Sequence, residues 1–309
     1  MIYNNILEAL GNTPMIRLNR IAPEDGADIY VKYEGLNVGG SVKTRTAFNM
    51  LNEAEKQGII TKDTIIVEPT SGNQGIGIAL VGAVKGYKVK IIMPDSVSEE
   101  RRMLVSQYGA EVILIHDDGD IGKCIDECLN TALKMRDEDP NVYVPQQFVN
   151  PDNNAAHKKG TAMEILQQMG EVKIDGFCSG IGTGGTITGI GEVLKADNPS
   201  VEIWAVEPEN AAILSGHKVG THIQMGIGDG LIPDNLNTNI YNGICIVTDE
   251  EALEMSKRLA REEGLLCGIS SGSNVTAAVK LAKKLGRGKT VVTLLPDTGE
   301  RYFSTKLFE

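Results

Sequence analysis

The sequence lacks an excess of positive charge, a long hydrophobic run and a signal segment, and each absence narrows the function. Asp and Glu number 41 against 30 Lys and Arg, which gives a formal net charge of −11. Nucleic acids and anionic membranes bind basic surfaces, so we expect neither as a partner. The longest apolar stretch, residues 75–84, is short and interrupted by glycine. The first residues are neither basic nor apolar, and we therefore expect a cytoplasmic protein.

Disulfide and metal-binding patterns are also missing. The five cysteines (Cys124, Cys128, Cys178, Cys245 and Cys267) form an odd set without a C-x-x-C motif, which suits reduced thiols. Cys124 and Cys128 lie four residues apart on an expected helix, but no histidine is spaced to complete a metal site with them. We expect no metal and interpret both cysteines as packing residues.

Strand-like and helix-like segments alternate along most of the chain. The β-branched runs at 64–67, 89–92 and 112–115 are each followed by helical periodicity, and the alternation resumes after the turn-rich residues 140–154. This alternation predicts an α/β fold with parallel sheets that carry helices on both faces.

The length of 309 residues is large for one core, so we expect two such domains, at 1–146 and 147–309. Residues 13–34 are expected to cross to the other sheet. A ligand should bind in the cleft between the domains, at the carboxyl ends of the strands. Residues 211–241 show weak periodicity and are expected to line this cleft as loops.

A lysine stands at the expected start of a helix, directly after Gly39-Gly40-Ser41-Val42. A lysine in the first turn lies near the positive end of the helix dipole, which disfavours its protonated form. Lys43 is therefore a candidate to form a Schiff base, although most lysines are simply solvated surface residues.

A glycine-rich loop at residues 180–186 joins a strand-like segment to a helix-like one. Backbone N–H groups at a helix start bind anions, and the hydroxyls of Thr183 and Thr186 add donors suited to phosphate. The loop also fits G-x-G-x-x-G, and Glu207 closes the next strand about where a ribose-binding acid would lie. A nicotinamide-dependent dehydrogenase that uses Gly180 to Gly185 is therefore an alternative function.

A second polar loop follows the strand at 64–67. Thr70, Ser71 and Asn73 place short polar side chains beside helix-start amides, an arrangement that suits a carboxylate. Hydride transfer does not require two anion sites, whereas a phosphate-bearing cofactor acting on an amino acid does. The pair of loops therefore favours pyridoxal phosphate.

A third loop, at residues 267–273, opens another helix with three serines. A neutral hydroxyl beside a pyridine nitrogen would leave that nitrogen unprotonated and suit chemistry at a β-carbon. A helix cap accounts for one serine equally well, and the residues alone leave both interpretations open.

Taken in order, these motifs resemble the cysteine synthase and cystathionine β-synthase family, pyridoxal-phosphate enzymes of the tryptophan-synthase-β fold type. The resemblance spans nearly the whole chain. It rests on residues 11–14, 40–43, 70–73, 147–148, 182–186, 226–228 and 299–302.

The resemblance implies that Lys43 holds pyridoxal 5′-phosphate as a Schiff base and later acts as acid and base at the substrate α-carbon. It implies that Asn73 contacts the cofactor's 3′-oxygen and that Ser270 faces the pyridine nitrogen. The implied phosphate site is Gly182, Thr183, Gly184, Gly185 and Thr186, and the implied site for the substrate carboxylate is Thr70, Ser71, Asn73, Gln74 and Gln147. It further implies a homodimer that acts on a small amino acid such as O-acetylserine or L-cysteine. A silent amino-acid sensor fits less well with Lys43 retained.

Two residues depart from the family pattern at the site. Gln74 stands where the family has Thr, and Asp229 stands where cysteine synthases carry a small apolar residue. The family expels a β-substituent to leave an aminoacrylate, which a nucleophile then attacks. A nearby carboxylate would repel hydrosulfide but would act as a general base for neutral water or a thiol.

We therefore expect β-replacement on a β-substituted L-alanine, with sulfide as nucleophile or leaving group. A catalytic Asp229 would favour sulfide release from L-cysteine to give serine or lanthionine. An Asp229 that points away and caps a turn is an equally good interpretation of the residue alone.

Overall fold

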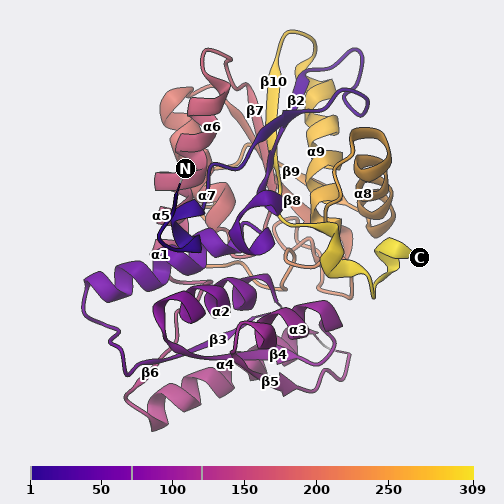
Figure 1. Ribbon diagram of the computed structural model, residues 1–309. Coiled ribbons are helices and arrows are strands. Elements are labelled where there is room, and N and C mark those ends of the chain that lie inside the picture. Colours follow the sequence, from indigo (N-terminus) through magenta and orange to yellow (C-terminus); the bar gives the residue numbers. More distant parts are fainter. Residues whose placement is uncertain (1, 71, 120) are drawn as a thin grey trace.

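Two β-sheets with helices on both faces make up the protein (Figure 1). The structure is a computed structural model that describes residues 2–70, 72–119 and 121–309. The expected α/β fold with two parallel sheets is confirmed, apart from one antiparallel edge strand.

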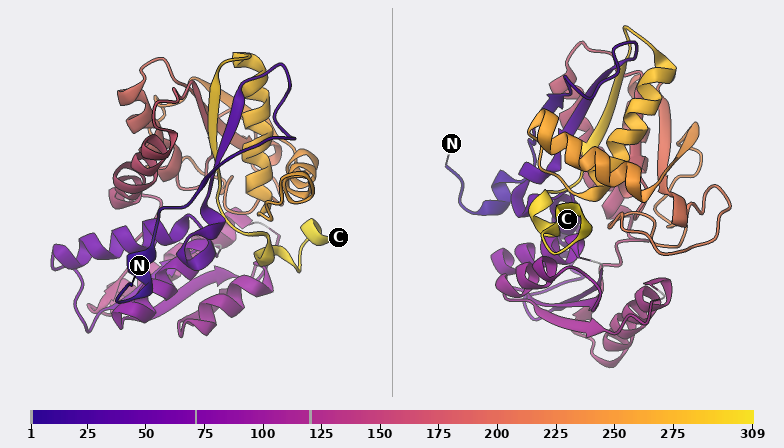
Figure 2. Two further views of the ribbon diagram at one scale, coloured as in Figure 1. Left: turned by 45° about the horizontal axis from the view of Figure 1, so that its top comes forward. Right: turned by 90° about the vertical axis from the view of Figure 1, so that its right-hand side faces the viewer.

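The larger sheet has six strands. Their spatial order is β1 (Met15–Arg17), β2 (Asp28–Tyr33), β10 (Thr290–Leu295), β7 (Gly176–Gly180), β8 (Glu202–Pro208) and β9 (Gly243–Val247). All neighbours are parallel except β1, which runs antiparallel to β2. Figure 2 shows the indigo β2 beside the yellow β10, so the beginning and the end of the chain lie in one sheet.

Helices cover both faces of this sheet, which explains the apolar character of its central strands. In β10, Val291 and Leu295 pack toward α8 (Asp249–Glu263) and α9 (Ile269–Leu285). Val292 and Leu294 face the other way, toward the helices on the opposite side. Those helices are α6 (Ala162–Met169) and α7 (Gly185–Asp197).

The smaller sheet has four parallel strands in the order β5 (Glu111–Ile115), β4 (Lys88–Pro94), β3 (Ile65–Pro69) and β6 (Val142–Tyr143). One face carries α1 (Lys43–Lys56), α2 (Asn73–Lys85) and α3 (Glu99–Gln107), and the other carries α4 (Ile121–Glu138). Cys124 and Cys128 lie on the buried face of α4, as expected of packing residues. Within the described residues, no helix is long and apolar enough to cross a membrane.

The prediction of turns at residues 140–154 is wrong in part. This stretch contains β6 and the start of α5 (Pro151–Ala156), which Asn150 caps by accepting a hydrogen bond from Asp152 N. A two-residue strand is too short to show a period. A π-helix (His157–Thr161) then joins α5 to α6. The remaining short helices are of the 3₁₀ type and span Ile6–Ala9, Glu34–Leu36, Val38–Gly40, Glu209–Ala211, Gly299–Tyr302 and Lys306–Phe308.

A buried ionic network fixes α1 between the two halves. Arg45 of α1 pairs with Glu34, which follows β2, at 2.8 Å and with Glu164 of α6 at 2.7 Å. Lys32 of β2 also pairs with Glu164, at 2.8 Å. Burial acts to raise the pKa of Glu164, but Arg45 and Lys32 outweigh it and lower the pKa to about 2. The network thus ties the helix that begins with Lys43 to the larger sheet.

We predict that Arg45→Met lowers the free energy of unfolding by about 3–5 kcal/mol, because it leaves Glu34 buried without its cation. Urea unfolding monitored by circular dichroism measures the change. Lys56→Met is the matched control: Lys56 pairs with Glu53 at the surface, and the loss of such a pair should cost at most about 1 kcal/mol. Equal, small losses in the two variants would contradict this role of the network.

Candidate active site

A cavity of about 240 Å³ lies between the two halves, with residues of both in its wall. Pro69 and Pro94 end β3 and β4 of the smaller sheet, and Gly180 and Leu294 stand at the ends of β7 and β10 of the larger one. The carboxyl ends of parallel strands from both sheets therefore meet at one cavity, where ligands bind in such folds.

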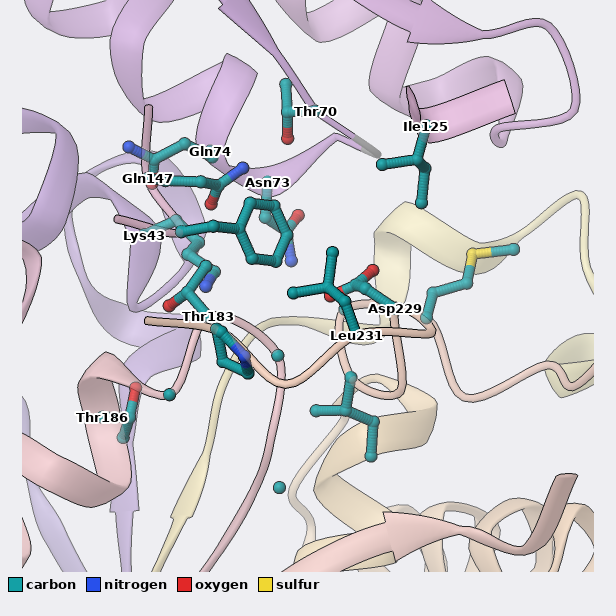
Figure 3. Close-up of a pocket in the computed structure, with 18 of the residues that line it drawn as sticks. Lys43, Thr70, Asn73, Gln74, Ile125, Gln147, Thr183, Thr186, Asp229 and Leu231 are labelled. Carbon is teal, nitrogen blue, oxygen red and sulfur yellow. The ribbon is translucent and has the colours of Figure 1, made fainter. Parts of the chain in front are cut away.

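Lys43 is the first residue of α1, and its side chain points into this cavity (Figure 3). Burial lowers the pKa of the Lys43 amine, while the charge of Asp229 opposes that shift. The sequence argument relied on the helix dipole, and removal from water adds a second cause that acts in the same direction. Either effect favours the neutral, nucleophilic amine.

The glycine-rich loop leads from β7 into α7 along one wall of the cavity, where Gly182, Thr183, Gly184 and Thr186 contribute to the lining. Gly184 has a left-handed backbone with φ 76°. A Cβ on Gly182 would lie 2.4 Å from the carbonyl oxygen of Gly226, so only glycine fits there. Gly185 does not line the cavity, and a Cβ at this position would lie 2.1 Å from Asn153 Oδ1.

Several helices that start at the cavity have no side chain that caps their first turn. No side-chain cap is present at α2, α7 or α9, and α3 and α6 lack one too, whereas α8 has a full capping box. At α1, Lys43 N donates to Ser41 Oγ at 3.3 Å. Backbone N–H groups at the starts of α2, α7 and α9 can therefore bind a ligand. With the hydroxyls of Thr183 and Thr186 beside α7, this donor set fits a phosphate group.

Residues of the second polar loop line the opposite wall, together with Gln147 (Figure 3). Ser71 lies outside the described residues. Asn73 donates to Asp297 Oδ2 at 2.6 Å and accepts from Arg301, which fixes its amide. Gln74 Oε1 accepts from Thr46 Oγ1 at 2.7 Å, and its buried Nε2 has no partner within the described chain.

Ser270 also lines the cavity, at the start of α9, and is 4% exposed. The neighbouring Asn274 accepts a hydrogen bond from Gly180 N at 2.7 Å and donates to Leu294 O at 3.0 Å. Asn274 thereby joins the glycine loop to β10. The sequence offered no signal for this contact, because the bonded residues are 94 and 20 positions away.

Asp229 lies on the loop that covers the cavity, and its carboxylate points into it (Figure 3). Gly228 N donates to Ile181 O at 2.8 Å, which fixes this loop against the glycine-rich one. Burial raises the pKa of Asp229, while the neighbouring Lys43 and His222 act to lower it. The loop belongs to residues 212–242, which contain neither helix nor strand. The expectation of loops and short elements at 211–241 fits this stretch, since Ala211 ends a 3₁₀ helix.

The interpretation of Glu207 as a ribose-binding acid is wrong. Its carboxylate accepts hydrogen bonds from Leu214 N at 2.7 Å and from Ser215 Oγ at 3.0 Å. Glu207 is buried and does not line the cavity. The pattern in the sequence located the residue correctly at a strand end but could not show which way its side chain turns.

The comparisons with known proteins agree with this geometry. The family model described as pyridoxal-phosphate dependent enzyme matches residues 6–297, and the chain belongs to this family. It is 47% identical over 305 residues to a cysteine synthase of Staphylococcus aureus, which covers 99% of this chain and 97% of that protein. The protein is accordingly a pyridoxal-phosphate enzyme of the cysteine synthase type, and the dehydrogenase alternative is wrong.

Two solved structures show the range of chemistry on this fold. One is an O-ureido-L-serine synthase with 38% identity and a TM-score of 0.94, covering 100% of this chain and 96% of that one. The other is a hydrogen sulfide-producing enzyme of Fusobacterium nucleatum with 41% identity and a TM-score of 0.91, covering 97% of this chain and 100% of that one.

We predict that Asp229→Asn lowers the pKa of the Lys43 amine further in the cofactor-free chain, because it removes the negative charge that opposes the effect of burial. Competitive labelling of Lys43 with acetic anhydride across neutral to alkaline pH, followed by peptide mass spectrometry, locates the midpoint. Asp234→Asn is the control, since Asp234 lines the cavity but is not among the charges that shift Lys43. Equal midpoints in the wild type and Asp229→Asn would mean that the two groups do not interact.

Proposed function

We propose that the protein releases sulfide from L-cysteine by β-replacement, with water or a second L-cysteine as the incoming group. The net reactions balance: L-cysteine and water give L-serine and hydrogen sulfide, and two molecules of L-cysteine give lanthionine and hydrogen sulfide. The observation that carries the proposal is the carboxylate of Asp229 in the same cavity as Lys43.

The residues of this chain have distinct parts in the proposal. Bound pyridoxal phosphate supplies an electron sink for the bond that breaks at the α-carbon. Lys43 Nζ holds the cofactor, then takes the proton from the substrate α-carbon and returns it. Asn73 and Ser270 contact the cofactor ring. The loop of Gly182 to Thr186 holds its phosphate.

The substrate carboxylate is held by the second polar loop, through Thr70, Ser71, Asn73 and Gln74, and by Gln147. Glu68 supports it from behind, since its buried carboxylate accepts from Gln146 N at 2.9 Å and Gln147 N at 3.0 Å.

Asp229 decides the direction of the sulfide chemistry. Its negative charge disfavours the approach of hydrosulfide, which is largely an anion at neutral pH. The same carboxylate accepts a proton from water or from a neutral thiol as either attacks the β-carbon. The similarity to a hydrogen sulfide-producing enzyme supports this direction, and the similarity to cysteine synthases supports the reverse one.

The experiment that tests the proposal is incubation of the enzyme with L-cysteine alone, with an assay for sulfide and identification of the amino-acid product by mass. Rapid sulfide release with serine or lanthionine is the expected result. Slow release, together with rapid cysteine formation from O-acetylserine and sulfide, would make the enzyme an ordinary cysteine synthase. Lys43→Ala should lose both reactions.

We predict that Asp229→Ala lowers the rate of product formation from L-cysteine by about 100-fold or more, the usual contribution of a general base. The measurement is the initial rate of serine plus lanthionine formation. Asp234→Ala, at another acid of the cavity wall, should stay close to wild type. Full sulfide release in Asp229→Ala would eliminate the catalytic role of this carboxylate.

The family resemblance also leads us to propose a cytoplasmic homodimer. Light scattering of the purified protein checks the dimer, since a mass of one chain would contradict it.

A further inference from the structure

A buried arginine without a carboxylate partner stands in the wall of the active-site cavity. Arg101 of α3 is 2% exposed and lines the cavity together with Thr70, Met225 and Asp229. Its guanidinium donates to Met225 Sδ at 2.8 Å and to Tyr302 Oη at 2.9 Å. Its Nε has no partner within the described residues.

Neither partner carries a negative charge. The guanidinium also lies over the Tyr302 ring, 4.9 Å from its centre, and Tyr302 Oη donates to Asp297 Oδ2 at 2.7 Å, so the nearest carboxylate is reached only through the phenol. The thioether of Met225 is a weak acceptor, and the phenol of Tyr302 is a neutral one. No carboxylate of the described chain forms an ion pair with Arg101, whereas Arg45, which is equally buried, has two. A buried cation without a carboxylate partner is destabilising, so an anion that entered the cavity would be stabilised by Arg101.

We propose that Arg101 binds the carboxylate of an amino-acid thiol that acts as the incoming nucleophile. The inference rests on the proposed function, since it concerns the branch that gives lanthionine. The carboxylate of the first substrate has its own site at Thr70, Asn73 and Gln147, so Arg101 is available for a second one. Water and hydrosulfide carry no carboxylate, so Arg101 does not contribute to their binding in this way.

The charges around Arg101 favour such a nucleophile. Asp229 disfavours an anionic sulfur but accepts the proton of a neutral thiol. A guanidinium is suited to a planar carboxylate through paired hydrogen bonds. Asp229 and Arg101 together favour a molecule that has a neutral thiol at one end and a carboxylate at the other, as L-cysteine does.

The test uses the holoenzyme with O-acetyl-L-serine as first substrate, so it does not depend on sulfide release from L-cysteine. In the reaction acetate leaves, a C–S bond forms and the thiol proton passes to solvent. The nucleophiles are L-cysteine, 3-mercaptopropionate, which lacks only the amino group, and cysteamine, which lacks only the carboxylate. The measurement is kcat/KM for each thiol.

We predict that Arg101→Met lowers the ratio of kcat/KM for 3-mercaptopropionate to that for cysteamine by about 10–100-fold, the value of a hydrogen-bonded charge pair. The ratio for L-cysteine to cysteamine should fall similarly, through a raised KM for the carboxylated thiols. The matched control is Arg102→Met, at the next arginine of α3, which does not line the cavity and should leave both ratios unchanged.

Three outcomes would overturn the proposal. An equal loss for all thiols in Arg101→Met would show that Arg101 only holds Met225 and Tyr302 in place. If added sulfate inhibits the reaction of every thiol to the same degree, and the wild type does not discriminate among the thiols, the site binds a free inorganic anion. Thermal melting and cofactor absorbance show whether Arg101→Met folds. If it does not, the wild type alone is measured, and equal kcat/KM values for 3-mercaptopropionate and cysteamine would contradict the proposal.

Discussion

Three helix starts without a side-chain cap determine what the cleft can bind. Each of α2, α7 and α9 begins at the cavity without a side-chain cap. The backbone N–H groups of a helix start are costly when buried and unpaired, so a ligand that accepts hydrogen bonds is favoured there. A cofactor phosphate and a substrate carboxylate are both acceptors, which is why one cleft accommodates the two.

The position of Lys43 depends on contacts outside the cleft. Because Lys43 begins α1, any tilt of this helix would move its amine. Arg45, two residues further on, anchors the helix to Glu34 and Glu164 of the larger half. Since the folded-state pKa of Glu164 is lowered, this stabilisation is complete above about pH 4.5 and is lost as the pH falls toward 2. Acid should therefore loosen the support of the lysine.

Features encoded within a few adjacent residues could be predicted from the sequence. The loop at 180–186 and the helix start at Lys43 were found because glycine and threonine spacing is a local property. The alternation of strands and helices predicted both sheets for the same reason. The two-residue β6 escaped because it has no period to detect.

Features that depend on distant partners could not be predicted. Glu207 was misread because its side chain turns toward Leu214 and Ser215, away from the cleft. Arg101 stood out only once its neighbours Met225 and Tyr302 were known, since both lie more than a hundred residues away in the sequence. The pKa of Lys43 likewise depends on burial by the whole fold, which no local pattern reports.

The pairing of β2 with β10 has a consequence for the order of folding during synthesis. Residues 28–33 leave the ribosome early, but their partner strand, residues 290–295, is made almost last. The smaller sheet needs only residues 65–143 and can form while the rest of the chain is still being made. The early strand must wait, with its edge unpaired on one side, until the final strand emerges and closes the larger sheet between β2 and β7.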